Sequence, residues 1–301
     1  MDTSAPAAVA PAPATLPPEG RLTSVAGVRF HHLELGTGPP AVFLHGGGPG
    51  CTGWSDFGPV APLFAAGRRC LLVDLLQYGR SEKCQITGPM WDFHATALVG
   101  LLDALGIERA DFVCNSWGGS AALCLAARHP ERVRALVVTG SMPVPYGPLA
   151  PLPEGGRRGR LARDRYYGGE GPTREKMRDL IGRLEWYDPA RLPAATVELR
   201  YQQSLDEGER ALAAISDQPR GEPQDLTGEL GRIRAPVLFL WGMYDAFLTP
   251  DYPLMLARMV PRGSLHVLDR AGHHPQEERP HAYHRVVEGF LAGDPDPGGA
   301  R

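Results

Sequence analysis

The chain has 301 residues, of which 43% are hydrophobic and 22% charged, and its formal net charge is −3. This length allows one large domain with an insertion, or two domains, and it can bury a core without disulfides or metals. The weak net charge argues against a nucleic-acid partner, and no run of about 18 apolar residues predicts a membrane span. We therefore expect a small-molecule substrate, no nucleic acid and no membrane.

The two ends of the chain differ in composition from the middle. Residues 1–20 are rich in Ala and Pro but lack the basic start and apolar stretch of a signal peptide, so a disordered tail is predicted. Residues 293–301 are predicted to be a flexible C-terminal tail. The five cysteines form no CxxC pair, which argues against a zinc site or a disulfide framework. Reduced thiols are typical of the cytosol, so we expect a cytoplasmic protein.

Short apolar runs alternate with helical patterns along the chain. The runs cover residues 41–44, 70–74, 112–114, 135–139, 237–241 and 265–268. Helical periodicity follows the second run at 95–105 and the third at 119–129. Runs that are apolar on both faces are typical of central parallel strands covered by helices. The pattern predicts an α/β fold with a doubly wound, mostly parallel sheet. His31 and His32 are expected in an edge strand before the first run.

The regular alternation stops between residues 143 and 225. Five prolines open this segment, an arginine cluster follows at 157–165, and helices are predicted around 174–184, 194–205 and 207–215. No strand-like run is recognised there. We interpret residues 143–225 as a helical lid inserted into a core made of residues 21–142 and 226–292. The arginine cluster is expected to form a solvated lid surface.

The segment Cys114-Asn115-Ser116-Trp117-Gly118-Gly119 lies where a strand must turn into a helix. A nucleophile elbow needs small residues on both sides of its serine, because the turn brings backbones together. Such a turn strains the serine backbone and exposes its hydroxyl. The alternative is an ordinary serine N-cap before a glycine-rich helix.

Three further signals follow predicted strands. The glycines of the segment 45–50, HGGGPG, let backbone N–H groups face a developing oxyanion, and Trp117 N–H is a second donor. A phosphate-binding loop is the alternative, but GxGxxG and the P-loop lysine are missing. Asp245 follows the fifth run and His273 the sixth. A serine nucleophile needs an imidazole base that a carboxylate orients, and the order Ser116, Asp245, His273 suits this fold.

Taken singly, each residue has an alternative to a catalytic role. Asp245 alone is also typical of a turn, and His273 alone is also typical of a loop. No His, Cys or Asp set has metal-ligand spacing, so neither a metal nor a cofactor is expected.

Over residues 25–291 the sequence resembles the α/β-hydrolase fold superfamily, and more narrowly the meta-cleavage-product hydrolases, which cleave carbon–carbon bonds of ring-fission products. The resemblance depends on HGGGPG at 45–50, GWS at 53–55, residues 74–81, NSWGG at 115–119, WG at 241–242 with Asp245, GH at 272–273 and ELRY at 198–201.

The resemblance implies that Ser116, His273 and Asp245 form the triad and that Gly47 and Trp117 supply the oxyanion donors. It implies that Asn115 and Arg200 hold the oxygens and the carboxylate of a 2-hydroxy-6-oxo-dienoate. Arginine does bind carboxylates bidentately, and an amide can bond an enol or a ketone. The alternatives are a surface-helix residue at Arg200 and a turn residue at Asn115.

Several residues around the site depart from the family pattern. Trp117 replaces the usual methionine and is more similar to the proline iminopeptidases, Asp56 replaces an asparagine, and His274 replaces a tryptophan. Asp56, His274 and Gly46 are further candidates for substrate binding. These departures point to a bulkier or less anionic diketone than a standard dienoate.

The sequence therefore predicts a cofactor-independent serine hydrolase that cleaves a C–C bond next to a ketone. It leaves open whether serine or water attacks, which substrate is used, and whether the chain forms a homodimer. An esterase, a lactonase or a proline iminopeptidase-like enzyme is one alternative, the last needing lid acids such as Glu170, Glu175 or Glu185 to bind an amine. A non-hydrolytic cyclase or a ligand receptor on the same fold is the other.

Overall fold

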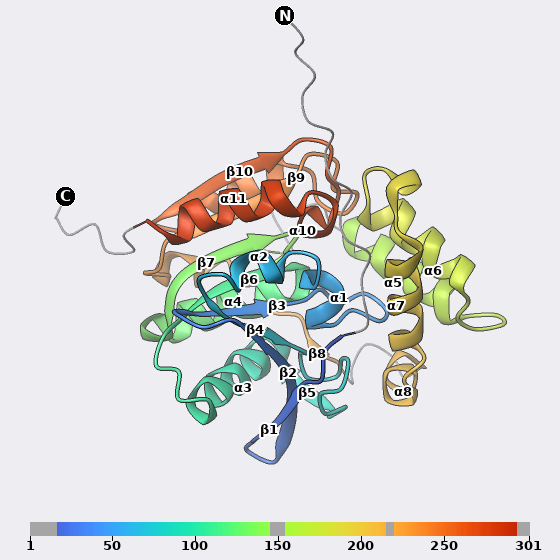
Figure 1. The fold of residues 1–301 in the computed structure, drawn as a ribbon, viewed down its shortest axis with the longest axis horizontal. Coiled ribbons are helices and arrows are strands. Elements are labelled where there is room, and N and C mark those ends of the chain that lie inside the picture. The colour runs from blue at the N-terminus through green and yellow to red at the C-terminus, as the bar shows by residue number, and fades with distance from the viewer. Residues whose placement is uncertain (1–16, 145–153, 215–219, 294–301) are drawn as a thin grey trace, which may run out of the picture.

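The computed structural model describes residues 17–144, 154–214 and 220–293 (Figure 1). An eight-stranded sheet has the order β1-β2-β4-β3-β6-β7-β9-β10, and β5 and β8 form a separate pair. The strands are β1 Arg21–Val25, β2 Val28–Leu35, β3 Pro40–Leu44, β4 Arg69–Val73, β5 Ile86–Pro89, β6 Ala110–Asn115, β7 Val133–Thr139, β8 Arg220–Glu222, β9 Val237–Gly242 and β10 Gly263–Leu268.

The predicted mostly parallel sheet is confirmed. The six predicted runs correspond to β3, β4, β6, β7, β9 and β10, which pair in parallel with one another. Every residue of β6 and β9 is buried, as expected for strands covered on both faces. The prediction that His31 and His32 lie in an edge strand is wrong. They belong to β2, which pairs antiparallel with β1 on one side and β4 on the other.

Helices cover both faces of the sheet (Figure 1). The side chains of α3, α4 and α9 join one apolar cluster, and those of α1, α2 and α11 join a second cluster on the opposite face. These elements and the short helices between them are α1 Gly53–Phe57, α2 Ala61–Phe64, α3 Met90–Ala104, α4 Ser116–Arg128, η1 Pro130–Arg132, η4 Leu230–Arg232, α9 Asp251–Met259, α10 Pro275–Glu278 and α11 Pro280–Leu291.

A third group of helices stands beside the sheet, at the right of Figure 1. It consists of α5 Glu154–Tyr167, α6 Arg174–Leu180, the π-helical turn η2 Ile181–Glu185, η3 Pro189–Arg191, α7 Ala194–Ser204 and α8 Glu207–Ala214. Tyr166, Met177, Ile181, Trp186 and Val197 are buried together between them. This helical group, which we call the lid, therefore has an apolar cluster of its own.

The lid boundaries at residues 143 and 225 stay a prediction. Residues 145–153 and 215–219 lie outside the described residues, as do 1–16 and 294–301 of the predicted tails. Within the predicted lid, the arginine-rich segment forms helix α5, which was not recognised in the sequence. Near its end β8 pairs with β5, contrary to the expectation that this segment has no strand. Among the described residues, no helix combines the length and apolarity that a membrane crossing requires.

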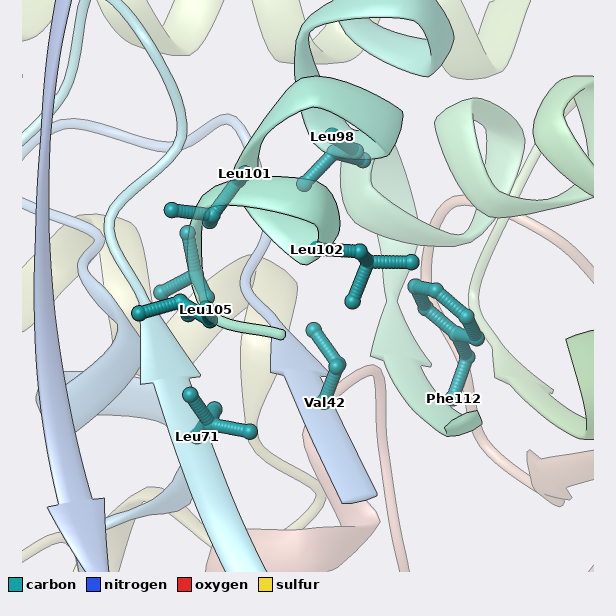
Figure 2. Close-up of a pocket in the computed structure, with 8 residues that line it drawn as sticks. Val42, Leu71, Leu98, Leu101, Leu102, Leu105 and Phe112 are labelled. Atoms are coloured by element: carbon teal, nitrogen blue, oxygen red, sulfur yellow. The ribbon is translucent and has the colours of Figure 1, made fainter. Parts of the chain in front are cut away.

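A small cavity of about 10 Å³ lies between α3 and the strands β3, β4 and β6 (Figure 2). Leu102 points from α3 toward Val42 and Phe112, and every lining residue is apolar. A dry space this small belongs to the packed core and cannot bind a substrate.

We expect Leu102→Ala to lower the free energy of unfolding by about 3 kcal/mol, because it enlarges this cavity and removes buried methyl groups. Urea unfolding measures the change. The control is Leu161→Ala on α5, where the side chain is 50% exposed and the expected change is below about 0.5 kcal/mol. Equal losses in the two variants would contradict this account of the core.

Candidate active site

Ser116 occupies the sharp turn between β6 and α4. Its φ is +48°, in the left-handed region that disfavours side chains, and it is the first residue of α4. Asn115, not Ser116, is the N-cap, so the ordinary N-cap interpretation does not fit. A Cβ on Gly118 would lie 2.5 Å from the Leu44 carbonyl oxygen, and one on Gly119 would lie 2.0 Å from Ser141 Oγ. Glycine at both positions therefore permits the close approach that an elbow needs.

Asp245 and His273 form a buried hydrogen-bonded pair. Asp245 Oδ2 lies 2.8 Å from His273 Nδ1, and the two side chains are 1% and 7% exposed. Asp245 Oδ1 accepts from the backbone N–H groups of Phe247 and Leu248, at 2.8 and 3.1 Å. Both carboxylate oxygens are therefore fixed, and the pair leaves His273 Nε2 as the nitrogen that can take a proton.

The neighbours of His273 place its ring beside the elbow. The ring lies 4.6 Å from that of Phe247, and a Cβ on Gly140 would lie 2.5 Å from His273 Cε1. Asn115 at the end of β6 pairs with Thr139 at the end of β7. The next residues, Ser116 and Gly140, therefore lie beside each other just beyond these two strand ends. The structure thus gathers Ser116, Asp245 and His273 at the carboxyl ends of β6, β7, β9 and β10, as expected for this class of sheet.

The HGGGPG loop packs against the elbow. Gly47 lies under the Trp117 ring, since a Cβ there would be 2.2 Å from Trp117 Cε3. The Trp117 N–H is in the first turn of α4, where backbone donors have no partner within the helix. These positions suit the two predicted oxyanion donors.

His45 supports this loop and is not a catalytic base. It accepts from Leu75 N–H at Nε2 (2.9 Å), so its proton is on Nδ1, which donates to Gly46 O (2.7 Å). Burial lowers the pKa of His45.

Lid arginines contact the backbone of both site loops. Arg163 Nη2 donates to the carbonyl of Gly47 at 2.9 Å, and Tyr78 Oη donates to the same oxygen at 3.3 Å. Arg158 Nη1 donates to the carbonyl of Ala246, next to Asp245, at 2.9 Å. Arg158 is exposed, as expected for a solvated arginine cluster, whereas Arg163 is half-buried, so the expectation is wrong for Arg163.

The candidate residues Asn115 and Gly46 lie beside Ser116. Asn115 is fully buried, and neither atom of its amide has a hydrogen-bond partner among the described residues. A Cβ on Gly46 would lie 3.3 Å from Asn115 Nδ2 and 3.4 Å from Ser116 Cβ. The Gly46 N–H already donates to Asp56 at 2.8 Å, so it is not free to bind a substrate oxygen. The role of Gly46 in substrate binding stays a prediction, and it would have to use an atom other than this N–H.

Arg200 is buried and bonded to a residue that the sequence did not assign to the site. Its Nη1 and Nη2 donate to the two carboxylate oxygens of Glu185, at 2.9 and 3.1 Å, and its Nε donates to Pro49 O at 2.9 Å. The alternative of a surface-helix residue is excluded, because Arg200 is 1% exposed. The sequence suggests Glu185 only as an amine ligand of the iminopeptidase alternative, because no sequence signal links it to Arg200.

Asp56, His274 and Glu277 adjoin this ion pair. His274 Nδ1 lies 2.5 Å from Glu277 Oε1, and its Nε2 lies 3.8 Å from Glu185 Oε2. Ligand atoms of all three residues come within 4.8 Å of one another, which a metal site would need. Hydrogen bonds already engage these groups, however, with Asp56 accepting from Gly46 N–H and Ser55 Oγ. The arrangement fits a network of charges better than a cation site.

Burial and charge act against each other in this network. Burial opposes the positive charge of His274, but Glu185, Glu277 and Asp56 raise its pKa to about 9. Burial opposes ionisation of Asp56 and Glu185, yet neighbouring cations, His274 and Arg200 among them, hold the pKa of both carboxyls below their ordinary values. For Glu277 burial prevails, and its pKa is raised.

Comparison with known proteins agrees with this geometry. Residues 40–280 match the α/β-hydrolase fold family. The chain is 36% identical to a 2-hydroxy-6-oxononadienedioate/2-hydroxy-6-oxononatrienedioate hydrolase of Burkholderia vietnamiensis, over 88% of this chain and 91% of the relative. It is 37% identical to a 2-hydroxymuconate semialdehyde hydrolase of Pseudomonas sp., over 93% and 96%. The solved meta-cleavage product hydrolase from Pseudomonas fluorescens superposes with a TM-score of 0.79 at 25% identity, over 91% and 97%.

The chain belongs to the α/β-hydrolase fold family. Its relatives further place it among the meta-cleavage product hydrolases, cofactor-independent serine hydrolases that act on C–C bonds. The predicted family resemblance, fold and enzyme class are thereby confirmed, whereas the roles of individual residues stay predictions.

For this hydrolase we expect stability to fall as the pH rises through about 9. The pKa of His274 is raised from 6.5 to about 9 in the folded chain, so its protonation stabilises the fold fully below pH 6.5. Up to about 3 kcal/mol is lost above the raised pKa. Unfolding by urea between pH 6.5 and 10, with His274→Gln as the control for other titrating groups, measures this. An unchanged slope in the variant would refute the role of His274.

We expect Arg163→Ala to lower kcat/KM about tenfold or more without a comparable loss of stability, because Gly47 loses a donor that fixes its loop. Arg160→Ala, an exposed arginine on the same helix, is the matched control. Steady-state kinetics and thermal unfolding of both variants measure the effect. Equal activity in the two variants would show that the lid contact does not position the loop.

Proposed function

We propose that Ser116, His273 and Asp245 hydrolyse the C–C bond next to a ketone in a dienoate or a related diketone. The observation that carries this proposal is the buried Asp245–His273 pair beside a serine with a φ of +48°. A serine hydroxyl needs a histidine base to act as a nucleophile at neutral pH. The histidine in turn needs a carboxylate that orients its ring.

The reaction begins with a proton transfer in which His273 assists conversion of the substrate dienol to its keto form. Next, Ser116 Oγ attacks the remote ketone while His273 Nε2 takes the hydroxyl proton. The N–H groups of Gly47 and Trp117 hold the resulting oxyanion. The C–C bond then breaks, its electron pair leaves as an enolate, and His273 returns the proton to carbon.

Water completes the reaction by hydrolysing the acyl-serine. In the alternative route, His273 activates a water molecule that attacks the ketone directly, and no acyl-serine forms. Mass spectrometry of Ser116 during turnover separates the two routes, since only the first adds the acyl group to the protein.

Asn115 is the residue of the elbow that suits a substrate oxygen. Its buried amide offers both a donor and an acceptor without a partner among the described residues. We infer that this amide forms a hydrogen bond with the enol or ketone oxygen of the substrate. That bond offsets the free-energy cost of burying an amide without a partner.

The esterase, lactonase and iminopeptidase alternatives keep the same triad. The iminopeptidase hypothesis is weakened by the lid acids, because Glu185 is paired with Arg200 while Glu170 and Glu175 are exposed.

We place the enzyme in the cytoplasm, as the five free cysteines suggest. A homodimer stays a prediction.

We expect a fluorophosphonate probe to label Ser116 at neutral pH, and Ser116→Ala to abolish labelling. Asp245→Asn should lower kcat for bleaching of a yellow dienoate ring-fission product by about 10⁴-fold, because the histidine loses its orienting carboxylate. Absence of an adduct would favour a receptor or cyclase. Turnover of short p-nitrophenyl esters far above that of any C–C substrate would favour an esterase.

A further inference from the structure

The ion pair between Glu185 and Arg200 lies directly beside the predicted oxyanion loop. A Cβ on Gly48 would be 2.9 Å from Arg200 Nη2 and 3.2 Å from Glu185 Oε1. The side chains of Arg200 and Glu185 are 1% and 5% exposed, so water does not screen their interaction. A substrate bonded to Ser116 and extending along residues 46–48 would meet this pair.

Arg200 has no free two-point face for a substrate carboxylate. Both terminal nitrogens are bonded to Glu185 and Nε to Pro49 O. Bidentate binding is what makes arginine a strong carboxylate ligand, and here Glu185 already supplies that geometry. A substrate carboxylate could bind Arg200 bidentately only by displacing Glu185, which would leave a buried negative charge without its partner.

The surrounding charges do not favour another anion either. Three carboxylates, of Asp56, Glu185 and Glu277, adjoin two cationic groups, of Arg200 and His274. Asp56 lies toward the nucleophile, because a Cβ on Gly46 would be 3.5 Å from Asp56 Oδ2 and 3.4 Å from Ser116 Cβ. A substrate carboxylate would add a fourth negative charge to this buried group, at a high desolvation cost.

We infer that Glu185 is a specificity-determining residue, which neutralises Arg200 and makes the enzyme select a ketone substrate whose far end is uncharged. The inference rests on the proposed function, since it assumes that Ser116 and residues 46–48 bind the reacting ketone. The family resemblance implies that a substrate carboxylate binds Arg200. In this chain the lid residue Glu185 supplies that carboxylate instead. Among the substrates of the proposed function, the preferred class is therefore a neutral diketone or an amide or ester of a keto acid, ahead of a dienoate with a free carboxylate.

Protection of Ser116 against a fluorophosphonate probe tests this inference without requiring turnover. The matched ligands are a saturated 6-oxo carboxylic acid and its primary amide, which are similar in size and differ in charge. We expect the amide to protect the wild-type enzyme at a concentration at least about tenfold lower than the acid, a difference of about 1.4 kcal/mol. Equal protection, stronger protection by the acid, or protection by neither ligand would overturn the inference. Failure of the probe itself to label Ser116 would overturn the proposed function.

Glu185→Gln then tests the residue, because it keeps the shape of the side chain and removes its charge. We expect the preference to shift at least about tenfold toward the acid, since Arg200 gains a free charge. Glu175→Gln, the same change at an exposed glutamate of the lid, should leave the preference unaltered. The shift should vanish when Glu185→Gln is made in an Arg200→Gln background, which separates the ion pair from a general structural effect.

A buried arginine without a partner is destabilising, so stability provides a second readout. The acid should raise the thermal unfolding temperature of Glu185→Gln more than that of the wild-type enzyme, because it replaces the missing carboxylate. If the variant does not fold, the comparison of acid and amide on the wild-type enzyme still decides. A variant that folds and keeps the preference for the amide contradicts the assignment to Glu185.

Discussion

The strained turn at Ser116 is the constraint on which the rest of the site depends. A φ of +48° on a residue with a side chain costs about 1–3 kcal/mol, which the packing of α4 must offset. That helix is buried from Gly118 to Ala127, and its first turn packs closely because the two glycines at 118 and 119 carry no Cβ. Gly118 N–H also donates to His45 O at 3.0 Å, so the same turn anchors the start of the predicted oxyanion loop.

Buried hydrogen bonds around the turn keep the other loops in place. The carboxylate of Asp74, at the end of β4, accepts from the backbone N–H groups of Gly53 and Arg80, both at 3.0 Å, and pairs with His31 at 2.8 Å. His45 links the predicted oxyanion loop to Leu75 in the same region. Donors fixed in this way need little reorganisation when negative charge develops on a substrate, which is the physical basis of oxyanion stabilisation.

Sequence patterns predict the part of this architecture that depends on local composition. The strands β6 and β9 contain continuous apolar runs, and the elbow directly follows β6, while Asp245 and His273 lie in the loops after β9 and β10. The strand β1 is not recognisable because polar residues interrupt it, and β2 is recognisable only around His31 and His32. The strands β5 and β8 are not recognisable because ITGP and RGE lack an apolar pattern. Helix α5 carries glycines and five arginines, so neither propensity nor periodicity distinguishes it from a loop.

The contacts of the lid could not be predicted, because they join segments whose relative position no local pattern records. Arg163 reaches a carbonyl 116 positions away in sequence, and Glu185 reaches Arg200 from a π-helical turn to a different helix. The sequence does identify Arg200 as a cation in the right region, but a buried guanidinium takes its role from whichever anion completes its hydrogen bonds. In a pocket without Glu185 that anion could be a substrate. Here Glu185 supplies that anion, so the strand ends carry the predicted catalytic residues, whereas contacts within the lid decide which charges lie beside them.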